Sequence, residues 1–85
     1  MFGGEVMLGW RRAMRIEQLG QAERHVRAAR RHIARQQAMV AKLALAGHDT
    51  TEARASLQRL AELLAAQITA RDRIRAEADE LKRDR

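Results

Sequence analysis

Apolar residues recur with a seven-residue period in the first half of the chain. Four branched or long aliphatic residues stand seven apart, and four mostly small or polar residues follow each by three: Leu19, Val26, Ile33 and Val40, then Ala22, Ala29, Gln36 and Leu43. This is the a/d pattern of a helix that packs against another helix. It predicts a long helix from residue 14 to residue 46.

The second half carries a similar but less regular pattern. Its two sets of seven-residue repeats are Leu57, Leu64, Arg71 and Ala78, and Leu60, Gln67, Ile74 and Leu81. Arg71 and Gln67 interrupt the apolar series. The pattern predicts a second helix over residues 50–82, and each helix is roughly 45 to 50 Å long at about 1.5 Å per residue.

The segment between the two patterns, Gly47, His48 and Asp49, is predicted to form a turn. Gly47 suits the left-handed residue that ends a helix, because it has no Cβ. Asp49 or Thr50 can cap the next helix, and with Asp49 as N-cap, Glu52 is placed to complete a capping box. A connection this short between long helices predicts antiparallel neighbours.

Folding the chain at this turn brings complementary residues together. Small residues on one helix meet large ones on the other in three facing pairs, Ala29 with Ile68, Ala22 with Ile74 or Arg75, and Leu19 with Ala78. Large aliphatic residues meet in the other three, Val40 with Leu57, Ile33 with Leu64, and Ile16 with Leu81. This alternation fills a core without voids. The predicted fold is all-α, an antiparallel two-helix hairpin that resembles a coiled coil.

Apolar residues outside a two-helix seam predict that a second chain covers them. Met39, Leu45, Leu60 and Leu63 crowd the closed end of the hairpin. Burying a large aliphatic side chain contributes about 1.5 to 3 kcal/mol, a large amount for a small fold. We expect a homodimer that forms a four-helix bundle, with a different protein partner or an exposed monomeric hairpin as the alternatives.

The first 13 residues, MFGGEVMLGWRRA, lack the heptad pattern and hold three of the five glycines. We expect a flexible extension over residues 1–13, with Met14 as a candidate for the true start. The alternative is a short docking or membrane-touching segment that uses Phe2, Met7, Leu8 and Trp10. Neither an export signal nor a transmembrane segment is indicated, because no run approaches the roughly 20 apolar residues needed.

Composition favours helix and offers little chemistry. The 85 residues include no Pro and no Cys. The absence of Cys excludes disulfides and thiolate metal sites and is consistent with a cytoplasmic protein. His25 and His32 lie about 10 Å apart along one helix, too far to bind one metal ion. His48 beside Asp49 is interpreted as an exposed turn residue. We expect no enzymatic activity, no cofactor and no metal.

Positive charge is concentrated in the first half. Residues 1–47 hold nine Lys/Arg and three acids, whereas residues 48–85 hold eight of each. Within the first half, Arg24, Arg27, Arg31 and Arg35 follow three- and four-residue steps along an outward face. This face predicts either phosphate binding to nucleic acid or a solvated surface partly paired with Glu77, Asp79 and Glu80. The second interpretation is favoured, because no base-stacking aromatic residue or recognition motif accompanies the arginines.

The run AERHVRAARRHIARQQAMVAKLALAGHDTTEARASLQRLAELLAAQ, residues 22–67, is similar to a group of small uncharacterised helical proteins of alphaproteobacteria such as the rhizobia. Its most specific part is GHDT, Gly47 to Thr50. The resemblance implies a helical hairpin and a bacterial setting, and no activity. The sequence therefore predicts a structural or protein-interaction module, with nucleic-acid binding through the first helix as the alternative and peripheral membrane attachment as a third hypothesis.

Overall fold

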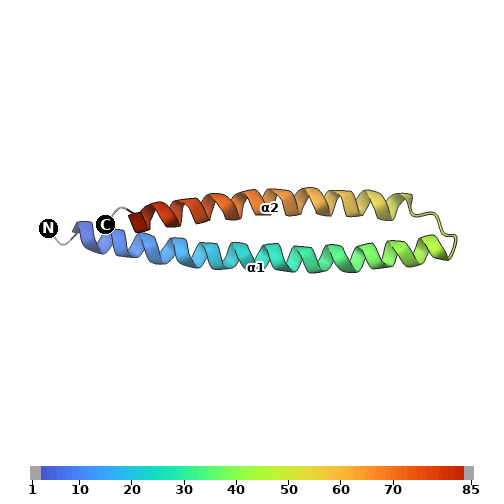
Figure 1. Ribbon diagram of the computed structural model, residues 1–85, viewed down its shortest axis with the longest axis horizontal. Helices are drawn as coiled ribbons and strands as arrows, with labels where there is room; N and C mark the ends of the chain where they lie inside the picture. The colour runs from blue at the N-terminus through green and yellow to red at the C-terminus, as the bar shows by residue number, and fades with distance from the viewer. Residues whose placement is uncertain (1–2, 84–85) are drawn as a thin grey trace.

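The structure, a computed structural model, describes residues 3–83, without the side chains of residues 3–6 and 8. This part of the chain forms two α-helices, α1 (Gly3–Leu45) and α2 (Thr51–Arg83), joined by a short turn. Figure 1 shows them side by side in opposite directions, with both termini at one end and the turn at the other. The predicted all-α helical hairpin is confirmed.

The predicted extension over residues 1–13 is wrong for residues 3–13, because α1 already begins at Gly3. Glycine lowers helix stability by only about 1 kcal/mol per residue, so the glycines of this segment do not break a helix. The heptad also continues through it, but with arginines in place of aliphatic residues. Arg12 and Arg15 are half-buried at the positions where the seam continues. Phe2 lies outside the described residues.

The seam between the helices follows the predicted heptads. With Val26 taken as position a of α1 and Leu57 as position a of α2, every a and d position from Arg12 to Leu43 and from Ala53 to Leu81 is buried or half-buried. Arg71 and Gln67 occupy two of these positions, as expected. Ile16 does not face Leu81 as predicted, because it lies one position outside the seam, at position e, and is 60% exposed.

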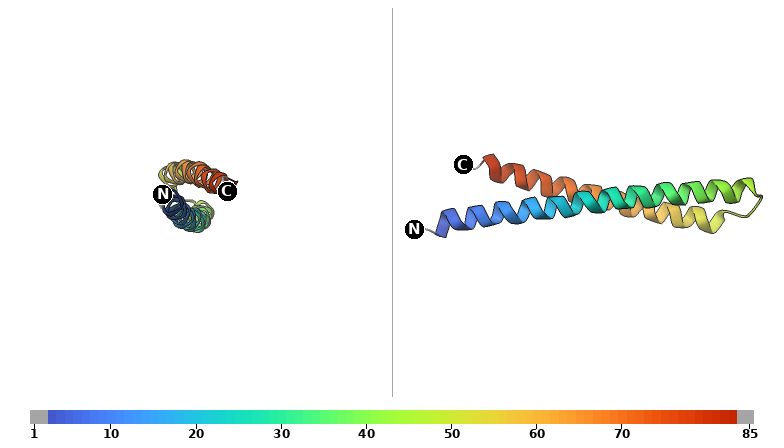
Figure 2. Two further views of the ribbon diagram at one scale, coloured as in Figure 1. Left: turned by 90° about the vertical axis from the view of Figure 1, so that its left-hand side faces the viewer. Right: turned by 90° about the horizontal axis from the view of Figure 1, so that it is seen from below.

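The hairpin is long, thin and poorly buried. It measures 70 × 16 × 14 Å with a radius of gyration of 19.4 Å, whereas a compact domain of this length is expected near about 12 Å. It exposes 6740 Å², against about 5,100 Å² for a compact protein of 9.7 kDa. Within the described residues only Val26, Val40 and Ala78 are buried. The two helices cross rather than run strictly parallel (Figure 2).

Candidate interaction surfaces

The turn ends α1 through a Schellman motif. The His48 N–H donates to the Leu43 carbonyl at 3.0 Å, and the Gly47 N–H donates to the Ala44 carbonyl at 3.1 Å. Gly47 has φ 80°, the left-handed conformation predicted from the sequence. His48 is exposed, as the sequence indicated.

Asp49 and Thr50 share the cap of α2. Oδ1 of Asp49 accepts from the Thr51 N–H at 2.9 Å and from the Thr51 hydroxyl at 2.7 Å. Both hydrogen bonds lower the pKa of Asp49 below its ordinary value, and the bond from the hydroxyl has the larger effect. The Thr50 carbonyl accepts from the Arg54 N–H, so Thr50 is the N-cap and Asp49 precedes it. The capping box through Glu52 is not formed, because Glu52 makes no hydrogen bond to Asp49 in the described turn.

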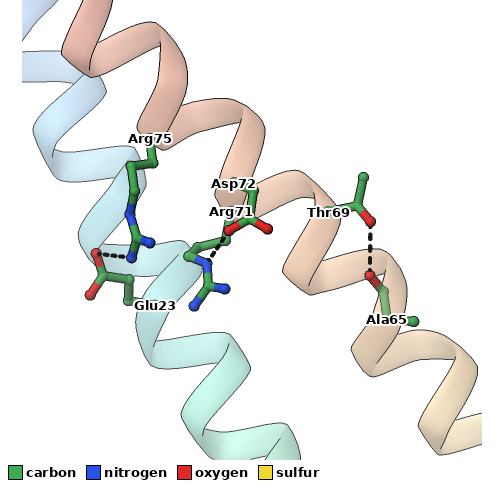
Figure 3. Close-up of polar contacts among 6 residues, drawn as sticks. All are labelled: Glu23, Ala65, Thr69, Arg71, Asp72 and Arg75. Atoms are coloured by element: carbon green, nitrogen blue, oxygen red, sulfur yellow. Dashed lines mark hydrogen bonds and ion pairs between the residues drawn. The ribbon is translucent and has the colours of Figure 1, made fainter.

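The middle of the seam contains polar groups. In Figure 3 the Arg71 guanidinium extends from α2 toward α1, and its Nε lies 2.8 Å from Oδ1 of Asp72. One turn away, Oε1 of Gln67 is buried and has no hydrogen-bond partner among the described residues. Arg71 keeps 18% of its side chain exposed. This seam therefore contributes less apolar burial than its length suggests.

Arginines occupy the seam positions at the end of the hairpin near the termini. Nη2 of Arg12 donates to the Leu81 carbonyl at 3.2 Å, and Nη1 of Arg15 lies 3.0 Å from Oε2 of Glu77. A second ion pair crosses between the helices on the opposite flank, from Arg75 to Glu23 at 3.7 Å (Figure 3). The aliphatic stems of Arg12 and Arg15 replace the apolar residues that the heptad lacks here.

The four residues predicted to form an oligomer interface do not share one surface. Leu60 is half-buried at a d position of the intramolecular seam, so its assignment to an outer surface is wrong. Leu45 lies at position f and is 89% exposed near the turn, on the side away from the seam. Met39 and Leu63 both lie at position g, and they are 56% and 52% exposed. In an antiparallel pair the g positions of the two helices flank the same side of the seam.

That side of the hairpin, defined by positions c and g of both helices, is here named the groove face. Two grooves of about 500 and 450 Å³ open on it. They share Arg15, Gln18 and Glu77 and so form one continuous depression over the half of the hairpin that holds the termini. The wider lining comes from both helices and includes Trp10, Met14, Gln21, Ala22, His25, Ala70, Ile74, Glu80 and Leu81.

Exposed apolar side chains gather on the groove face. Seven large apolar side chains are exposed in the described part of the chain, and five lie on or beside this face: Met7, Trp10, Met14, Met39 and Leu63. The sequence interpretation named Trp10 only in an alternative docking segment before the helix, and it missed Met14 as a surface residue although it placed Met14 at the start of the helix. Their c and f positions, read back from the heptad of α1, were the signal that would have found them.

Arg24, Arg27, Arg31 and Arg35 are all exposed; the first three lie on the outer side of α1, and Arg35, at position c, lies at the edge of the groove face. None of them belongs to an ion pair within residues 3–83. The predicted pairing of this face with Glu77 is wrong for the single chain, because Glu77 pairs with Arg15. The four arginines form a basic strip whose charges face solvent.

His25 and His32 are exposed at g positions, and His25 lines the groove. No cluster of three or more His, Cys, Asp or Glu that could hold a metal ion occurs in the described residues. Neither described helix has an apolar stretch long enough to cross a membrane.

Comparison with known proteins yields no relative. No family model, no curated protein and no solved structure matches the chain. The similarity of residues 22–67 to the alphaproteobacterial group therefore stays a prediction.

Proposed function

We propose that this protein is a non-enzymatic interaction module that works by self-association, with two hairpins forming a four-helix bundle in the cytoplasm. The observation that carries this proposal is the mismatch between burial and exposure. Only three described residues are buried, while five large apolar side chains lie on or beside one face. Large apolar side chains that gather on one exposed face are typical of interaction sites.

The available area supports a stable pair. The groove face has the dimensions of the hairpin, 70 by 16 Å, which is roughly 1,000 Å². Two copies meeting through it bury about 2,000 Å² in total, at the upper end of standard-size interfaces. The opposite flank carries the Glu23–Arg75 ion pair and one exposed large apolar residue, Ile16.

Sedimentation velocity of two matched variants tests the proposal. Leu63→Lys places a charge on the groove face, whereas Ile16→Lys places one on the other flank, and both residues are more than half exposed in the single hairpin. We expect Leu63→Lys to dissociate the dimer, because burying an unpaired charge is costly. Ile16→Lys should sediment like the parent. Equal behaviour of the two variants would contradict the proposal.

A second candidate function is nucleic-acid binding through the basic strip. It is supported by four exposed arginines that have no ion-pair partner within the described residues. Such a strip binds phosphates with an affinity that falls steeply as salt rises.

The test replaces Arg24, Arg27, Arg31 and Arg35 together by Gln. Exposed ion pairs contribute only about 0 to 1 kcal/mol each, so the helicity should be preserved. The dimer should also persist, because Arg35 is the one member of the four on the groove face and Gln places no charge there. Under the interaction-module proposal neither protein retards DNA or RNA near 0.15 M salt. A complex of the parent that persists at this salt concentration and is lost in the Gln variant would establish the second function instead.

A further inference from the structure

The groove face has a depression in one half and two exposed large apolar side chains in the other. The depression lies toward the termini, between Met14 and Gln18 of α1 and Glu77 and Leu81 of α2. The exposed apolar residues, Met39 and Leu63, lie toward the turn. When a second copy is turned end to end, the apolar side chains of each copy lie over the depression of the other.

Resting on the function proposed above, we propose that two copies dock through their groove faces with their long axes reversed. In this arrangement Met39 and Leu63 of each copy enter the depression of the other. The twofold axis is perpendicular to the helices and passes near His25 and Ala28 of α1. Each contact then occurs twice, as in an isologous interface.

The heptad fixes the register of this pairing. When α1 lies over α1 of the second copy and the hairpins overlap fully, each c position faces a g position. Met14 then faces Met39, and His25 faces Ala28. The contacts Arg12–Leu81, Arg15–Glu77 and Glu23–Arg75 fix the level of α2 beside α1. They place Leu63 level with Ile74 and Glu77 of the second copy, which line the depression.

Charge on α2 favours the reversed over the parallel arrangement. In the reversed dimer Arg59 lies close to Glu80 of the second copy, and both side chains are exposed in the single hairpin. In a parallel dimer α1 lies over α2, so Arg59 meets Arg35, a residue of the same sign, and the two depressions face each other. Arg11 and Lys42 form a like-charge contact in the reversed dimer, at its ends, where solvent screens it.

Thiol cross-linking with a short bis-maleimide tests the arrangement, because the chain has no Cys and each variant carries a single thiol. A mixture of Met14→Cys and Met39→Cys should cross-link, while Met39→Cys alone should not, since its two thiols lie roughly 37 Å apart at about 1.5 Å per residue. Ala28→Cys should cross-link alone. Its matched control, Ala34→Cys, replaces another exposed alanine, on the other flank, and should not.

Cross-linking of Met39→Cys alone would overturn the reversed arrangement in favour of a parallel one. Cross-linking of Ala34→Cys but not Ala28→Cys would overturn the choice of face, while the proposed function would stand. A parent that sediments as a monomer would overturn both proposals.

Charge reversal gives a second test that leaves the apolar contacts intact. Glu80→Arg and Arg59→Glu should each raise the dimer Kd by about 2- to 30-fold, the range expected for two exposed ion pairs per dimer. The double variant should return to the Kd of the parent. A double variant no tighter than the single ones would contradict the Arg59–Glu80 contact and with it the reversed register.

Discussion

At the residue scale, the turn is the part of the molecule in which single side chains do most to set the fold. Gly47 adopts φ 80° and leaves open space where a Cβ would stand. A side chain there costs backbone strain only, because nothing is crowded. The effect of a substitution at Gly47 therefore reports the backbone conformation of the turn and not its packing.

Replacing Gly47 by Val should lower the free energy of unfolding by about 1 to 2 kcal/mol, because a β-branched residue is strained in the left-handed region. Gly47→Asn should cost less, since Asn tolerates this conformation. Thermal melts of the two variants and the parent measure the difference. Identical melts for Val and parent would contradict the Schellman turn.

Asp49 should make the stability depend on acidity. Its folded-state pKa is lowered by the two hydrogen bonds from Thr51, so its contribution is complete above the ordinary value of 3.8 and is lost as the pH falls through the lower folded-state value. The difference in melting temperature between the parent and Asp49→Ala should therefore be constant near neutral pH and shrink in strong acid. A difference that grows on acidification would show that the carboxylate does not cap α2.

At the element scale, the length of α1 is the feature that departs most from the sequence interpretation. The heptad of Leu19, Val26, Ile33 and Val40 was sufficient to predict the helix and its partner. The pattern is hidden at the start of α1, because Arg12 and Arg15 occupy the seam positions on either side of Met14 with their aliphatic stems. The glycines of this segment favour a loop by composition, but without a proline they do not end the helix.

Gly9 offers a direct test of this longer helix. It is exposed within α1, and a Cβ placed there meets nothing within 4 Å. Gly9→Ala should raise the free energy of unfolding by about 0.5 to 1 kcal/mol if residue 9 is helical in the folded protein. Chemical denaturation with far-UV circular dichroism measures it, and an unchanged midpoint would place residue 9 outside the helix.

The candidate interface could be predicted only in part. The sequence identified Met39 and Leu63 as apolar residues in need of cover, but it grouped them with Leu60, which fills the seam, and Leu45, which lies near the turn on the outer side. Periodicity alone does not show which flank of a hairpin carries a groove, since the shape of each flank depends on the side chains of both helices. The depression between Met14 and Leu81 emerges only when α1 and α2 are placed together.

At the scale of the whole molecule, the hairpin has more surface than a protein of its mass needs. Its exposed area of 6740 Å² and the polar groups of Arg71 and Gln67 within the seam leave the single chain with little apolar burial. Most of the stability of long helices in water comes from packing of an apolar face. In the proposed dimer, the second copy supplies that packing.

The weight-average mass of the parent protein, measured by sedimentation equilibrium over a wide range of concentrations, tests this dimer most directly. We predict a mass of twice 9.7 kDa at micromolar concentration, falling toward 9.7 kDa only on strong dilution, with helicity lost in parallel because the two processes are coupled. A stable, fully helical species of 9.7 kDa at every concentration would contradict the account.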